Sequence, residues 1–107
     1  MMLITLEEAK RHLRVDDESD DSDIELKTHA ASGAVRNYLK SAADAYFDAD
    51  GAVIADVVPF EVKAATMLML GYLYKDRDEN ADGAFDQGYL PKPVTALLYP
   101  LRDPAFA

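Results

Sequence analysis

The sequence predicts an all-α fold of about four helices in a small compact bundle, with a short β-hairpin or an extended loop between the second and third long helices. Apolar residues recur at helical spacing in four separate segments. A capping box opens the first segment, and prolines mark the starts of the last two. A length of 107 residues suits one domain, so we expect residues 1–107 to form a single domain.

The first predicted helix begins after Thr5 and ends near Arg14. Thr5 and Glu8 have the spacing of a capping box, in which each side chain accepts a hydrogen bond from the backbone N–H of the other residue. The apolar stripe of this helix consists of Leu6, Ala9 and Leu13. An acidic linker at 16–23 follows, and its carboxylates suit the positive end of the next helix dipole.

The second predicted helix runs to about Lys40. Ser19, Asp20 or Ser22 can cap its first turn. Its apolar face carries Ile24, Ala31, Val35 and Tyr38 beside Ala30 and Ala34. Gly33 weakens the helix by about 1 kcal/mol relative to alanine, but the surrounding pattern is long enough to carry it.

The segment 41–59 loses the helical period. Two short apolar pairs, at 46–47 and 53–54, flank the sequence Asp-Ala-Asp-Gly at 48–51. This arrangement predicts a turn and a small hairpin. The alternative is that the second helix continues through Ala42, Ala43 and Ala45.

The third predicted helix extends from Phe60 to Lys75, directly after Pro59. It is apolar on almost every side, and such a helix must be buried all round. Two interpretations fit equally well. Either the other three helices surround it, or another subunit covers part of its surface.

A polar loop that contains glycine is predicted from Arg77 to Tyr89, and a short fourth helix follows. Pro93 suits the first turn of this helix. Its apolar residues at helical spacing are Val94, Leu97, Leu98 and Leu101. Pro100 limits the helix, and we expect an extended tail after it.

The composition excludes several classes of function. A net charge of −9 disfavours binding to free nucleic acid, because that affinity comes from lysine and arginine. The same acidity is compatible with a wall that encloses DNA without holding it. Without cysteine the chain has no disulfide framework and no sulfur ligand for zinc. The early acid at Glu7 and the short apolar runs predict no signal peptide and no membrane span, with synthesis in the cytoplasm.

One loop, at 78–89, partly matches the pattern of a calcium site. Oxygen-bearing side chains stand at its positions one, three, five and nine: Asp78, Asn80, Asp82 and Asp86. Gly83 occupies position six, but Tyr89 replaces the bidentate glutamate at position twelve. We therefore expect no metal site and keep these four residues as candidates, with a calcium-binding helical module as an alternative function. A second candidate at 48–51 fails because Tyr46 stands where its first ligand should be.

Nothing in the sequence indicates an enzyme. His12 and His29 lie on separate predicted helices, and the serines lack the sequence of a nucleophile elbow. The five glycines are scattered and form no phosphate-binding loop. We therefore expect no catalytic residue and no cofactor.

A small helical regulator is a further alternative. The second helix offers basic and amide side chains of the kind that read a DNA groove: Lys27, Arg36, Asn37 and Lys40. These residues follow a strongly acidic leader, and no basic patch elsewhere joins them.

Four pieces of the chain, taken in order, carry a resemblance to a known family. The first is Thr-Leu-Glu-Glu-Ala-Lys-x-His-Leu-Arg-Val-Asp at 5–16, followed by an acidic linker and the long helix at 24–40. The apolar helix then ends in Leu-Tyr-x-x-Arg at 73–77, and Leu-Pro at 90–91 leads to Val-x-x-Leu-Leu-x-x-x-Arg. Together they resemble the small head-tail connector (adaptor) proteins of tailed bacteriophages, also described as small phage DNA-packaging proteins.

The resemblance implies a structural, non-enzymatic virion protein at the head-tail junction. Members of that family are all-helical, form a ring beneath the portal, extend the DNA channel and offer a platform for a tail-side connector or tail-completion protein. By implication this chain forms a homo-oligomeric ring, and DNA passes through its lumen without sequence-specific binding. The candidate subunit-interface residues are Met67, Leu70, Tyr74, Arg14, Arg77 and Arg102. The loops at 41–58 and 77–88 depart from the family pattern in length and acidity.

Overall fold

The computed structural model describes residues 2–75 and 90–101, and within these ranges the chain is helical with no strand. The elements, in chain order, are α1 (Leu6–Leu13), α2 (Asp21–Leu39), η1 (Lys40–Tyr46), η2 (Ala55–Val57), α3 (Phe60–Lys75), α4 (Lys92–Leu98) and η4 (Tyr99–Leu101), where η denotes a 3-10 helix. The predicted all-α fold with four α-helices is confirmed, and α3 has the predicted bounds.

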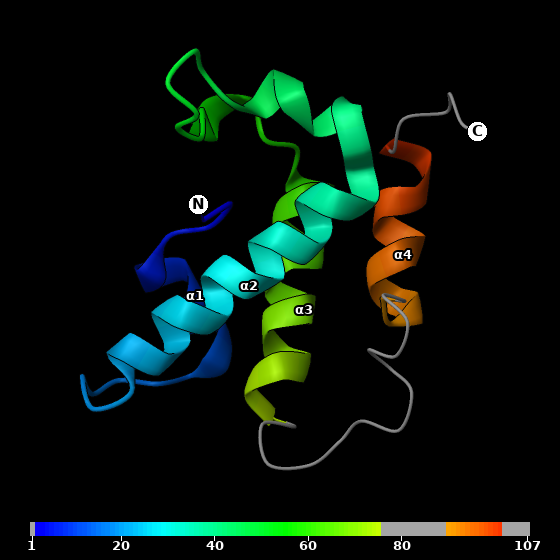
Figure 1. Cartoon of the computed structure of the whole chain (residues 1–107). Coiled ribbons are helices and arrows are strands. Elements are labelled where there is room, and N and C mark those ends of the chain that lie inside the picture. Colours follow the sequence, from blue (N-terminus) through cyan, green and yellow to red (C-terminus); the bar gives the residue numbers. More distant parts are fainter. Residues whose placement is uncertain (1, 76–89, 102–107) are drawn as a thin grey trace.

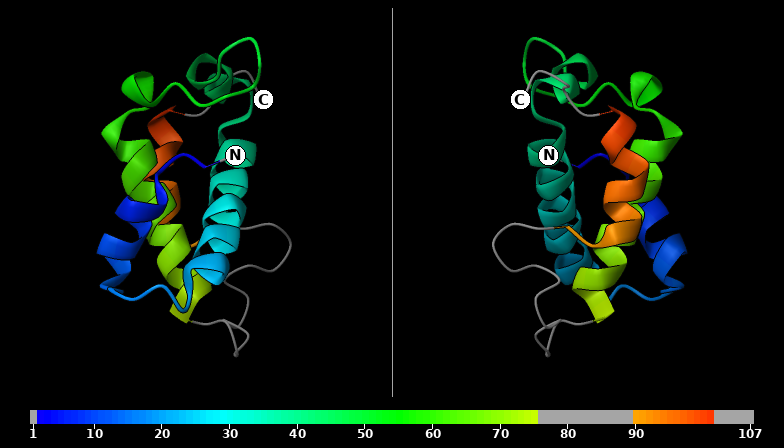
Figure 2. Two further views of the ribbon diagram at one scale, coloured as in Figure 1. Left: turned by 90° about the vertical axis from the view of Figure 1, so that its left-hand side faces the viewer. Right: turned by 90° about the vertical axis from the view of Figure 1, so that its right-hand side faces the viewer.

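The four α-helices form two layers. In Figure 1, α3 lies between α1 and α4, and α2 crosses over them on the near side. Figure 2 shows α2 on one side of the molecule and the other three helices on the opposite side. Helix α3 packs against α1, α2 and α4, so it is the central helix of the fold. Within 2–75 and 90–101, no helix covers the side of α3 that faces away from α2.

Helix α1 is capped at both ends, by the predicted capping box at its N-terminus and by Arg14 at its C-terminus. The backbone N–H of Glu8 donates to Thr5 Oγ1 at 3.0 Å, and the N–H of Thr5 donates to Glu8 Oε1 at 2.9 Å, which completes the capping box. At the other end, Arg14 adopts the left-handed conformation with φ 60°. Its N–H donates to the carbonyl of Arg11, as in common helix C-caps.

Helix α2 is anchored by its buried face. Asp20 takes the N-cap position, but its side chain makes no capping hydrogen bond. The buried residues are Ile24, Thr28, Ala31, Ser32, Val35 and Leu39. Ala30, which the sequence places beside this face, is exposed instead. The helix ends at Leu39, and Lys40 has φ 58° and ψ −137°, which turns the chain into η1.

The segment between α2 and α3 combines the two sequence alternatives. The chain stays helical through 40–46, but as the tighter 3-10 form. A four-residue turn then brings Phe47 opposite Val53 in one isolated antiparallel bridge. The Asp48 carboxylate accepts from the N–H groups of Asp50 and Ala52, at 2.8 and 3.0 Å, and Gly51 adopts φ 84°. The turn of the hairpin is therefore present without strands on either side.

Buried hydroxyl groups in the core are satisfied by nearby backbone. Thr28 donates to the carbonyl of Ile24 and Thr66 donates to that of Val62, both within their own helices. Ser32 Oγ accepts a hydrogen bond of 2.9 Å from the N–H of Leu3, which lies 29 residues away in sequence. This bond attaches the N-terminal segment to α2. Losing it would leave the buried N–H of Leu3 without a partner, which is costly.

Candidate functional site

Helix α3 has two apolar faces with different surroundings. Its inner face is buried against the rest of the chain and consists of Val62, Ala65, Thr66, Met69 and Leu70. On the opposite side, apolar residues recur at four-, four- and three-residue steps and lie on one side of the helix: Phe60, Ala64, Leu68 and Gly71. We call these four residues the outer stripe. Phe60 is 87% exposed, Ala64 is exposed, and the other two are half-buried.

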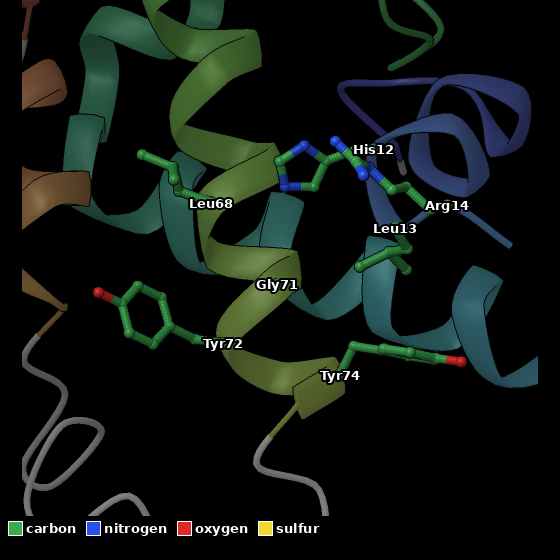
Figure 3. A pocket seen from close by; sticks show the side chains of 7 residues that line it. All are labelled: His12, Leu13, Arg14, Leu68, Gly71, Tyr72 and Tyr74. Atoms are coloured by element: carbon green, nitrogen blue, oxygen red, sulfur yellow. The ribbon is translucent and has the colours of Figure 1, made fainter.

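A groove of about 670 Å³ lies where the outer stripe meets the end of α1. It is lined by His12, Leu13, Arg14, Leu68, Gly71, Tyr72 and Tyr74. Figure 3 views α3 in front of α2, with the imidazole of His12 and the side chain of Arg14 on the α1 side of the groove. The His12 imidazole reaches α3 at Gly71, where a Cβ would lie in ordinary contact, 3.8 Å from His12 Nε2. We call this hollow the α1–α3 groove.

A polar cluster fixes the end of α3 near this groove. The Tyr74 hydroxyl donates to Asp20 Oδ2 at 2.9 Å, and Lys27 Nζ lies 5.7 Å from the centre of the Tyr74 ring. Lys27 also pairs with Asp23 at 3.0 Å. These contacts join the last turn of α3 to the first two turns of α2, and therefore hold one wall of the groove in place.

A second ion pair holds α1 against α2. Lys10 Nζ lies 2.7 Å from Asp21 Oδ1, an oxygen that is itself buried. The hydrogen bond to Asp21 raises the pKa of Lys10, and the negative charges of Glu18 and Asp17 act in the same direction. Lys10 is therefore committed to an intramolecular contact, whereas Arg11 and Arg14 are exposed.

An exposed apolar group lies at the other end of α3. Ile54, Val57 and Phe60 are 38%, 48% and 87% exposed, and they fall within seven residues of the chain. Two exposed acids, Asp56 and Glu61, stand among them in the sequence. We call the three apolar residues the knob. Single exposed apolar residues are ordinary on protein surfaces, but three within seven residues of the chain make this segment a candidate interaction site.

The predicted interface residues separate into three groups. Met67 and Tyr74 are half-buried and Arg14 is exposed, so all three keep accessible surface. Leu70 is fully buried inside the chain, so its side chain belongs to the core and offers no surface to a second subunit. Arg77 and Arg102 lie outside the described residues.

The candidate ligands for the calcium alternative, Asp78, Asn80, Asp82 and Asp86, also lie outside the described residues. In the described parts of the chain, no group of three or more acidic or histidine side chains is arranged to hold a metal ion. At 48–51, the Asp48 carboxylate is occupied by backbone N–H groups of its own turn.

The basic residues proposed for a DNA-reading helix are partly engaged inside the chain. Lys27 pairs with Asp23, and the guanidinium of Arg36 stacks 4.3 Å from the centre of the Phe47 ring. Asn37 on α2 is exposed, and so is Lys40, the first residue of η1. Of these four residues, α2 exposes Arg36 and Asn37, which are fewer side chains than a recognition helix uses for base and phosphate contacts.

Sequence reasoning missed the knob and the position of Gly71 in the groove. The signal was present, because the 60, 64, 68 and 71 positions recur on one side of a helix. An all-apolar helix hides this signal, since no polar face marks which side is outermost. The exposed Phe60 could be identified only when the packing of α2 on the opposite side was known.

Comparisons with known proteins identify one family. A family model described as phage gp6-like head-tail connector protein matches residues 3–102. No curated protein and no solved structure matches the chain. Among the described residues, no helix is both long and apolar enough to cross a membrane.

Proposed function

We propose, since this chain belongs to the phage gp6-like head-tail connector family, that it forms a homo-oligomeric ring at the head-tail junction of a phage particle. Proteins of this family are structural components of phage heads and tails. The ring would dock on the portal on one side and on a tail-side connector or tail-completion protein on the other. It would extend the DNA channel, after synthesis of the chain in the cytoplasm of the bacterial host.

The outer stripe of α3 carries this proposal. A helix that faces solvent normally presents polar side chains there, whereas this stripe is apolar from Phe60 to Gly71. Its exposure favours association with another protein surface. Of the predicted interface residues, Met67 adjoins this stripe and Arg14 borders the α1–α3 groove at its end.

The charge of the chain supports a passive role towards DNA. A net charge of −9 gives phosphate groups no general attraction to the surface. A ring of such chains would therefore allow a duplex to slide through its lumen instead of holding it. We propose that DNA is a passing cargo of the ring and that no base is read.

Light scattering across a concentration series, with and without the portal protein of the same phage, tests this function. We expect one discrete oligomer, formed either by the chain alone or only on the portal. A chain that stays monomeric in both conditions, and that does not bind the portal, would contradict the proposal. Retention of duplex DNA at low salt by the free protein would contradict the passive role towards DNA.

A further inference from the structure

We infer that the knob of one copy inserts Phe60 into the α1–α3 groove of the next copy, so that the subunits join head to tail. This inference rests on the proposed ring and names the two surfaces that would build it. The surfaces differ in shape. One projects as an exposed aromatic side chain, and the other is a hollow of about 670 Å³ with Leu68 and Gly71 on its α3 wall.

The two surfaces cannot meet within one chain. Phe60 opens α3, and Gly71 lies eleven residues further along the same helix. At 1.5 Å per residue, this spacing separates them by about 16 Å on a rigid rod. A contact between knob and groove must therefore join two copies. A contact between two different surfaces repeats from copy to copy and closes into a ring when the rotation permits.

The charges around the two surfaces are opposite. Asp56 and Glu61 stand beside the knob in the sequence, whereas Arg14 is the charged side chain that lines the groove. Copies with a net charge of −9 repel one another overall, so an attachment site needs local positive charge on one side. At the groove this charge comes from Arg14, since the nearby Lys10 is paired with Asp21.

Arg14 is available for such a contact. Its backbone caps α1, but its side chain is exposed and forms no ion pair with any residue in 2–75 or 90–101. Exposed ion pairs contribute little affinity, about 0 to 1 kcal/mol each. We therefore assign the affinity to Phe60 and the orientation of the contact to the charges, since buried aromatic anchors dominate most interfaces.

The first test compares Phe60→Ala with Leu26→Ala. Leu26 is 67% exposed on α2 and lies outside both surfaces, so it is a matched control. By light scattering, alone or on the portal, Phe60→Ala should raise the concentration for half assembly at least about tenfold. Leu26→Ala should leave it unchanged. Equal assembly of both variants would overturn the inference and leave the proposed ring intact, whereas failure of the unmodified chain to assemble would overturn both.

The second test maps the contact with disulfides, because the chain has no cysteine of its own. Glu61→Cys and Arg14→Cys are made as separate variants, mixed under assembly conditions and oxidised. A cross-link should form between them, and none should form when Asn37→Cys, at an exposed position on α2, replaces Glu61→Cys. A chain that carries both Glu61→Cys and Arg14→Cys should give a ladder of covalent oligomers. Cross-linked pairs alone would show a symmetric contact and would contradict the head-to-tail arrangement.

Discussion

The two faces of α3 both carry apolar side chains but differ in what surrounds them. The inner face, represented by Leu70 and Val62, is fully buried against the rest of the chain. The outer stripe begins with Phe60 at 87% exposure and continues to Gly71 at the α1–α3 groove. Apolar side chains therefore favour burial of both faces, but they do not show whether the same chain or another molecule covers each face. The inner face stabilises the fold, and we assign the outer stripe to assembly.

The largest expected effect on the free energy of unfolding comes from shortening a side chain of the inner face. Leu70→Ala should lower the free energy of unfolding by about 2 to 5 kcal/mol, because it leaves a cavity among fully buried neighbours. Phe60→Ala should change it by less than about 0.5 kcal/mol, since the side chain is exposed in the single chain. Urea unfolding of the two variants measures the contrast. Similar losses of unfolding free energy in both variants would contradict the assignment of the inner face to folding and the outer stripe to assembly.

Tyr74 tests whether a residue at the edge of the groove acts within the chain. Tyr74→Phe removes the hydrogen bond to Asp20 and should cost about 1 kcal/mol of unfolding free energy. A double-mutant cycle with Asp20→Ala isolates the coupling between the two side chains in urea unfolding. Loss of assembly at unchanged stability would instead place Tyr74 in the contact between subunits.

Substitutions at two glycines, one on α2 and one on α3, separate effects on stability from effects on assembly. Gly33 and Gly71 both lie in helices with room for a Cβ, so alanine at either should raise stability by about 0.4 to 1 kcal/mol. Only Gly71 borders the groove, and Gly71→Leu should fill it. We expect Gly71→Leu to weaken assembly. Gly33→Leu is the control, because Gly33 lies in α2 and does not line the groove, and it should leave assembly unchanged. Light scattering and thermal unfolding separate the two effects, and equal assembly of both leucine variants would refute the assignment of the groove.

The smallest expected effect is on the pH dependence of stability, through the hydroxyl of the buried residue Tyr46. Burial raises the pKa of Tyr46, and the charge of Glu61 adds to this shift. Above the ordinary tyrosine pKa of about 10 the unfolded chain loses this proton before the folded chain does, so stability falls as pH rises. Tyr46→Phe should reduce that alkaline loss in urea unfolding at pH 9 and 11. An unchanged pH dependence would show that Tyr46 is not protected by the core.

Local signals in the sequence predicted most of the helix positions. The capping box at Thr5 and Glu8 and the apolar run after Pro59 specify their helices through nearby atoms alone, and the structure confirms both. The segment 40–58 was harder, because helical continuation and a turn compete there. The chain adopts a 3-10 helix and then a turn held by the Asp48 carboxylate.

The candidate site could be predicted only in part. Met67 and Arg14 were proposed from the apolar helix and from the family resemblance. Both keep accessible surface, and their contact with a second subunit stays a prediction. Leu70 could not be told apart from them, since an all-apolar helix has no polar side to set its rotation. The exposure of Phe60 depends on which side of α3 packs against α2, a long-range contact that no local pattern encodes.

Hydroxyl-radical footprinting of the assembled and dissociated protein tests the central claim most directly, because it reports the solvent exposure of individual side chains. We predict that oxidation of Phe60 falls strongly on assembly. Oxidation of Leu26, which is also well exposed in the single chain, should stay unchanged. Phe60 that remains as reactive in the assembled state as in the free chain would contradict the assignment of the outer stripe to assembly.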